Sequence, residues 1–170
     1  MILGLVGSEM CIRDRKRVWM MISDQVYNVL TTGVGHIGCA SSSLKPFHAD
    51  ALGVCCDQAT SSIVCCVNKE TNKPFVNTLE IGSRVSLFVG VISHEAYNLK
   101  GDVTELRDVY DDERQACDDL RKQMYSLYGE LGIPENLAEK YWLKPANLAV
   151  VFSVDKVFVQ TPGPDAGKQI

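Results

Sequence analysis

Residues 71–101 carry the sequence TNKPFVNTLEIGSRVSLFVGVISHEAYNLKG, the most informative stretch of this 170-residue chain. A Thr-Asn-Lys turn opens a short helical segment over 72–81, which Gly82 ends. The nearly continuous apolar run 84–92 then predicts a strand that is buried on both faces. A polar cluster follows at 93–101. This order predicts an anion-binding turn beside a buried sheet, with hydrogen-bonding side chains at the far end of the strand.

The flanking sequence predicts further strands and helices. Ser23 is a good N-cap for a short helix, and 111–132 predicts the clearest helix because its apolar residues recur at spacings of three and four. Closely spaced turn signals predict an antiparallel arrangement. The strands expected, together with 84–92, are 36–42, 47–56, 63–67, 99–106 and 149–159. The fold class is therefore mainly β, a six-stranded and mostly antiparallel barrel with helices packed outside it.

Composition limits the function classes. The formal net charge of −4 is not the basic charge that is typical of nucleic-acid-binding proteins. Seven cysteines without a secretion signal indicate reduced thiols and a cytoplasmic location. No window approaches the roughly 18 uninterrupted apolar residues of a membrane helix.

The first residues differ from the rest of the chain. MILGLVGSEMCIRDR, residues 1–15, has neither helical nor strand periodicity. It resembles a translated sequencing-adapter read-through. The alternatives are a basic targeting arm and an ordinary disordered terminus. We therefore expect an artefactual or disordered N-terminus over 1–19 and one domain over 20–170.

The turn at 71–73 is the first candidate site. A phosphate needs several converging donors, and a helix N-terminus supplies backbone N–H groups with a favourable dipole. Thr71 adds a hydroxyl, Asn72 an amide and Lys73 an ammonium group. The alternative is a solvated turn with an ordinary N-cap.

The histidines and cysteines give weaker signals. His94 and Glu95 could transfer a proton, and His94 is the candidate for a catalytic acid or base. A hairpin with polar side chains and a surface histidine is the alternative. His48 lies on the second strand, facing either a ligand or the edge of the core. The cysteines fit small buried hydrophobes, and no metal site is expected because no zinc-ligand spacing is present.

Three motifs carry a resemblance to a known family. In order along the chain they are Asn72-Lys73-Pro74 with Asn77, Ala96-Tyr97-Asn98 with Lys100-Gly101, and the tail QTPGPDAGK at 160–168. Together they resemble the FMN-binding split-barrel proteins of the pyridoxamine 5′-phosphate oxidase-like superfamily, over roughly residues 23–170. Pro74 stands where such proteins often have Thr.

The resemblance implies a Greek-key split β-barrel that forms a homodimer, with FMN sites at the subunit interface. It implies that the phosphate sits by Asn72 and Lys73 and the ring against the strands of His48 and Tyr97. It also implies that the tail lies across the partner subunit or the ligand site, whereas composition alone allows a frayed terminus. The cofactor-binding residues expected are His48, Thr71, Asn72, Lys73, Asn77, Tyr97, Asn98 and Lys100.

The function implied is that of an FMN-dependent oxidoreductase acting on a small-molecule substrate or electron donor. One alternative is a flavin-binding or electron-transfer module without turnover. Another keeps the fold and changes the ligand to a deazaflavin or a haem, and a haem would need an axial His36, His48 or His94. No nucleic-acid or membrane partner is expected.

Overall fold

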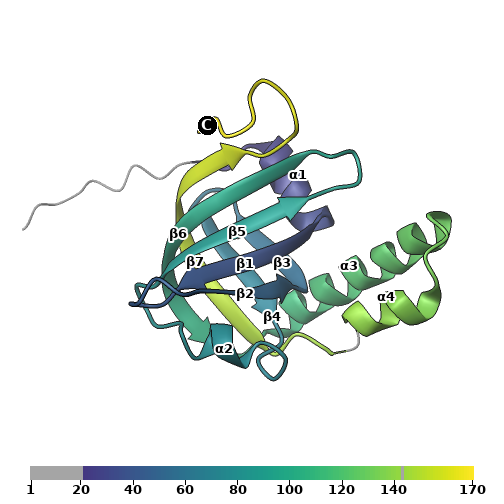
Figure 1. Ribbon diagram of the computed structural model, residues 1–170, viewed down its shortest axis with the longest axis horizontal. Helices are drawn as coiled ribbons and strands as arrows, with labels where there is room; N and C mark the ends of the chain where they lie inside the picture. Colours follow the sequence, from purple (N-terminus) through teal and green to yellow (C-terminus); the bar gives the residue numbers. More distant parts are fainter. Residues whose placement is uncertain (1–20, 143) are drawn as a thin grey trace, which may run out of the picture.

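The computed structural model describes residues 21–142 and 144–170 (Figure 1). The predictions for residues 1–19 lie outside the described residues. The elements, in chain order, are α1 Asp24–Thr32, β1 Val34–Ala40, β2 Pro46–Ala51, β3 Gly53–Asp57, β4 Ser62–Val67, α2 Lys73–Val76, β5 Arg84–Gly90, β6 Ala96–Arg107, α3 Asp111–Glu130, α4 Glu135–Trp142 and β7 Leu148–Val159.

All the named strands form one antiparallel sheet in the order β2-β1-β5-β6-β7-β4-β3. The order begins with β2 and ends with β3, although only Leu52 separates these two strands in the chain. The two ends of the sheet must therefore meet, and the sheet curls round on itself, as Figure 1 shows. The predicted class, mainly β and antiparallel with peripheral helices, is confirmed.

The predicted number of strands is wrong, because seven strands form where six were expected. The run 47–56, expected as one strand, divides at Leu52 into β2, which pairs with β1, and β3, which pairs with β4. Helix α3 approaches this point closely, since a Cβ on Gly53 would collide with the Cys117 side chain. Hydrophobic pattern alone does not reveal a change of pairing partner within an apolar run.

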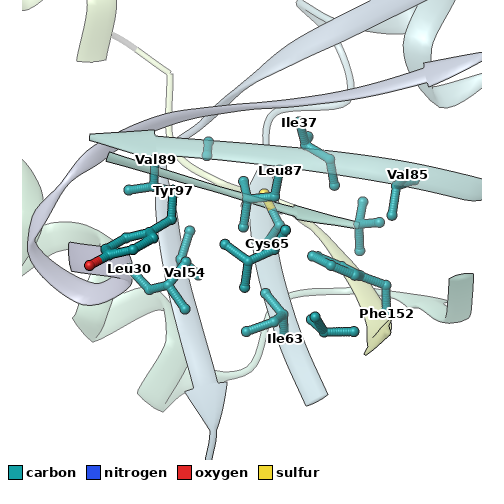
Figure 2. Close-up of a cluster of buried hydrophobic side chains, with 14 of the residues drawn as sticks. Leu30, Ile37, Val54, Ile63, Cys65, Val85, Leu87, Val89, Tyr97 and Phe152 are labelled. Atoms are coloured by element: carbon teal, nitrogen blue, oxygen red, sulfur yellow. The ribbon is translucent and has the colours of Figure 1, made fainter. Parts of the chain in front are cut away.

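The main core fills the inside of the curl. Figure 2 shows Leu30 of α1 facing side chains from several strands, including Ile37, Leu87 and Phe152, all of which are fully buried. The prediction that 84–92 is buried on both faces is wrong. Alternate residues of β5 are buried, whereas Phe88 on the outer face is 39% exposed, because no described helix covers that face.

Helices α3 and α4 form a hairpin that projects from the barrel (Figure 1). Gly132 ends the first helix with φ of +70°, a conformation that favours glycine. The sequence did not predict α4, which follows Pro134. A second apolar cluster joins this hairpin to the barrel through Leu120, Met124 and Trp142. Within the described part of the chain, no helix has both the length and the apolar character needed to cross a bilayer.

The C-terminal tail is held by its own chain. Thr161 bonds to Ala96 through both backbone and side chain. Gly167 N donates to Val159 O at 2.7 Å and Ile170 N to Val157 O at 3.0 Å. The tail thus loops back on β7 (top of Figure 1) and covers part of that strand's edge.

Candidate functional site

A basic cavity of about 560 Å³ lies between β2, the turn that joins β4 to α2, and helix α4. Its lining combines two lysines with amide and hydroxyl groups and one carboxylate. The residues that line it are Asp50, Leu52, Asn68, Thr71, Asn72, Leu137, Lys140 and Lys144. Its volume lies within the range of small-molecule sites, about 300–1,000 Å³.

Asn68 builds the turn that forms one wall of the cavity. This residue is 4% exposed, and its Oδ1 accepts from the backbone N–H groups of Glu70 and Thr71 at 3.1 and 3.0 Å. The Thr71 hydroxyl also donates to this oxygen, at 3.1 Å. The Asn72 amide donates to the Asn68 carbonyl at 2.9 Å. The donors expected to face a ligand are therefore used first to fix the turn.

A second set of hydrogen bonds connects this turn to the segment that follows α4. Asn68 Nδ2 donates to Pro145 O at 2.8 Å, and Asn147 Oδ1 accepts from the Lys69 backbone N–H at 2.9 Å. The Asn147 amide also donates to Glu70, and this bond holds the pKa of the Glu70 carboxyl below its usual range. Helix α4 is thereby anchored beside the turn. Lys140 of this helix and Lys144, in the segment that follows it, line the same cavity.

The carboxylate in the cavity is paired. Asp50 Oδ1 lies 3.0 Å from His36 Nδ1, on the neighbouring strand in direct register. The rings of His36 and His48 stand edge to face, with centroids 6.4 Å apart. The two lysines that line the cavity outnumber its one carboxylate, so the net charge of the cavity favours an anion.

The predicted cofactor residues lie in two places, around α2 and the turn that leads into it and on the outer face of the sheet, with one exception. Thr71 and Asn72 line the basic cavity. Lys73, the first residue of α2, and Asn77, its C-cap, do not line it. His48, Asn98 and Lys100 lie on the outer face of the sheet, in two neighbouring cross-strand rows. Within that face the Ser86 hydroxyl donates to Asn98 Oδ1 at 2.9 Å, and the Lys100 ammonium lies 5.2 Å from the centre of the Phe158 ring.

Tyr97 is the exception. It is 4% exposed and belongs to the core inside the curl, as Figure 2 shows. Its hydroxyl donates to Glu95 Oε1 at 2.8 Å, and burial together with this bond raises its pKa to about 12. Tyr97 is therefore turned away from the outer face that carries Asn98. His94 is exposed in the turn between β5 and β6, with φ of +66°, and does not line the basic cavity.

The described cysteines behave as small apolar residues. Cys39, Cys65, Cys66 and Cys117 are buried. Cys55 and Cys56 are half-buried, and burial raises the pKa of both thiols to about 11. In the described ranges, no three His, Cys, Asp or Glu side chains are placed to hold a metal ion.

Six residues that line the cavity were not expected from the sequence: Asp50, Leu52, Asn68, Leu137, Lys140 and Lys144. Lys140 lies on α4, which was not predicted, and Lys144 lies in the segment after that helix. Neither lysine carries a spacing signal in the sequence, because the packing of this segment against the turn at 68–72 brings them to the cavity. Asn68 carries a local signal that was not used, because an Asn side chain that accepts from backbone N–H groups two and three residues on is typical of a turn. Its bond to Pro145 required the fold.

Comparisons with known proteins show the fold. No family model matches the sequence, and no curated protein does either. The structure is similar to that of HupZ from Group A Streptococcus, with a TM-score of 0.51 and 12% identity over 86% of this chain and 100% of that one. It is also similar to a putative pyridoxamine 5′-phosphate oxidase from Lactobacillus delbrueckii, with a TM-score of 0.50 and 14% identity over 81% and 93% of the two chains. The chain therefore has the fold of the pyridoxamine 5′-phosphate oxidase-like proteins, as its motifs predicted.

Proposed function

We propose that the protein is an FMN-binding flavoprotein whose basic cavity holds the phosphate of the cofactor. One observation carries this proposal. The turn singled out from the sequence, Thr71-Asn72, lines the same cavity as Lys140 of α4 and Lys144 just after that helix, more than sixty residues further along the chain. The two ammonium groups favour a phosphate, and the turn, whose Thr71 and Asn72 donors are used within it, gives them a fixed wall to face.

The residues present fit such a group. The wall is rigid, because Asn68 satisfies the backbone of the turn and anchors it to Pro145. The apolar side chains Leu52 and Leu137 give the cavity a non-polar wall against which a flat ligand can pack. Asp50 opposes an anion, but its pairing with His36 reduces that effect.

The outer face of the sheet is the proposed seam of a homodimer. Phe88, 39% exposed, lies between His36 and Asn98 in register. An exposed aromatic side chain among polar neighbours is typical of an interface. His48, Asn98 and Lys100 would lie in or beside this seam, while the proposed role of Lys73 and Asn77 is to support the phosphate from α2.

A bound FMN would supply hydride or electron transfer, so the protein would act as an oxidoreductase on a small-molecule substrate or electron donor. The chain's own part is to bind and orient it. A flavin-binding protein without turnover is the alternative, favoured by the absence of histidine, cysteine and tyrosine among the described residues that line the cavity. A deazaflavin would use the same phosphate contacts. A haem fits less well, because no described histidine lines this cavity. A cytoplasmic location fits the free thiols of the described residues.

Lysine variants test the phosphate site. Lys140→Ala and Lys144→Ala are each expected to weaken FMN binding about tenfold, the scale of one charge-assisted contact. Lys73→Ala, outside the lining, is expected to have a smaller effect. The measurement is quenching of FMN fluorescence during titration of the full chain, with riboflavin as a ligand that lacks the phosphate.

Lys122→Ala is the matched control, since that lysine lies on α3 and pairs with Asp119. It should bind FMN like the wild type. Unchanged affinity in the Lys140→Ala/Lys144→Ala double variant would remove the cavity from the proposal. Equal losses for riboflavin and FMN would show that the lysines do not act on the phosphate.

A further inference from the structure

A second cavity, larger than the basic one, lies on another part of the molecule. It has a volume of about 810 Å³ and is open on one side. Four segments line it: the end of α1, the start of β1, the turn between β5 and β6, and the second half of α3 where that helix leaves the barrel (Figure 1). It shares no lining residue with the basic cavity. We call it the α1–α3 groove.

The α1–α3 groove is mainly apolar. Val29 and Met124, each 3% exposed, form a base that belongs to the packed core, so the floor is preformed. At the rim, Ile92 is 57% exposed and Leu131 is 55% exposed, one on each side of the groove. Large apolar side chains that flank a concave apolar surface are typical of a binding site.

The charges of the groove are opposite to those of the basic cavity. Its described lining residues include the carboxylates Glu95 and Glu130 and no lysine, arginine or histidine. A phosphorylated ligand would be repelled here. The two cavities therefore suit different ligands, and the inference does not depend on the proposed flavin site.

Glu95 is held in place on the wall. Its Oε1 accepts from Gln25 Nε2 at 2.7 Å and from the Tyr97 hydroxyl at 2.8 Å. Both donors are neutral, so they orient the carboxylate without cancelling its charge. No described residue donates to the other oxygen, Oε2. A fixed, half-buried carboxylate at the edge of an apolar groove matches an ammonium group attached to an apolar body.

We propose that the α1–α3 groove binds an apolar cation, such as an alkylammonium or arylammonium compound. Its apolar part lies against Val29, Met124 and Leu127, and its charged group lies beside Glu95. The concave shape and the volume of about 810 Å³ favour a small molecule over a second copy of the chain, because small-molecule sites are concave and typically about 300–1,000 Å³ in volume.

Two probes with the same alkyl chain and opposite charge test the proposal, namely decyltrimethylammonium and decyl sulfate below their micelle concentrations. The readout is the ¹³C-methyl resonance of Met124 in the full chain, so binding elsewhere does not count. Decyltrimethylammonium is expected to shift this resonance with a dissociation constant about tenfold below that of decyl sulfate. The Glu95 carboxylate attracts the ammonium group and repels the sulfate group.

Variants separate the two parts of the site. Glu95→Gln, which keeps the shape and an acceptor oxygen, should raise the dissociation constant of the cation about fivefold, the upper end for an accessible charge pair. Ile92→Ser should weaken both probes alike, because it removes only apolar contact. Glu80→Gln, an exposed carboxylate outside the groove, is the control and should change neither.

Equal affinity for the two probes, or a Glu95→Gln variant that binds the cation like the wild type, would overturn the proposal. A Met124 resonance that moves with protein concentration, and stops moving in Ile92→Ser, would overturn it in favour of a second copy in the groove. The same samples are titrated with FMN. Because the two cavities share no lining residue, the groove variants should bind FMN like the wild type, whether or not the groove binds the cation.

Discussion

At the scale of single residues, one buried ion pair ties the end of β6 to α3. Glu113 is 5% exposed, and its carboxylate accepts from two nitrogens of Arg107 at 2.8 and 2.6 Å. It also accepts from the Tyr110 backbone N–H at 2.9 Å, which caps the helix. The Arg107 guanidinium lies 3.8 Å from the centre of the Tyr110 ring. The hydrogen bond from Arg107 holds the pKa of Glu113 below its usual range.

Glu113→Gln is expected to lower the free energy of unfolding at pH 7 by roughly 2–3 kcal/mol. Breaking a fully buried ion pair costs about 3–5 kcal/mol. The loss here is smaller because the amide oxygen of Gln still accepts from the Tyr110 backbone N–H. The stabilisation from Glu113 is complete above the usual carboxyl pKa of 4.5 and is lost as the pH falls through the lowered pKa of the folded state. Urea unfolding at pH 7 and pH 3 measures the difference.

The gap between wild type and Glu113→Gln should therefore narrow at pH 3. Glu139→Gln, on the exposed surface of α4, should unfold like the wild type at pH 7. A gap of equal size at both pH values would show that the carboxylate charge does not contribute to the pairing.

At the scale of elements, the break between β2 and β3 determines how the sheet curls. The close approach of α3 at Gly53 leaves no room for a side chain, since a Cβ there would lie 3.1 Å from Cys117 Cα and closer still to its sulfur. The bend and the packing of α3 on β3 are therefore coupled through one small residue.

Gly53→Ala is expected to destabilise the protein by roughly 1–3 kcal/mol through overpacking. Cys117→Ala removes the sulfur, so the double variant should lose less than the sum of the two single variants. Urea denaturation of the four proteins gives the coupling energy. Gly129→Ala is the control on the same helix, because nothing lies within 4 Å of its added Cβ. It should be neutral or stabilising. Strictly additive losses would contradict the packing account.

The elements also show how far the sequence could be read. Strands with alternating or strongly apolar patterns and the amphipathic α3 were predicted within a few residues, because periodicity reports which faces are buried. The division at Leu52 and helix α4 were not. Both depend on contacts between segments far apart in sequence. The same limit applies to the candidate site: the turn at Thr71-Asn72 was visible in sequence, whereas its partners, Lys140 on α4 and Lys144 after that helix, required the fold.

At the scale of the whole molecule, the main core lies inside the curled sheet, and the outer face of the sheet is exposed around Phe88. Phe88 and the half-buried Phe158 lie there among polar side chains. If this face is the proposed homodimer seam, the wild type should sediment as a dimer. Phe88→Asp should shift it to monomer, because a buried unpaired carboxylate is costly.

Ile81→Asp is the control, since Ile81 is 63% exposed before β5 and outside the named strands. It should remain dimeric. A wild type that sediments as a monomer at concentrations well above micromolar would contradict the dimer proposal.

The proposed binding of FMN in the basic cavity can be tested directly. The most direct measurement is equilibrium titration of the full-length protein with FMN, followed by quenching of flavin fluorescence, with riboflavin titrated in parallel. The proposal predicts saturable binding of one FMN per chain, with riboflavin bound about tenfold or more weakly because it lacks the phosphate. The absence of saturable FMN binding, or equal affinity for FMN and riboflavin, would contradict it.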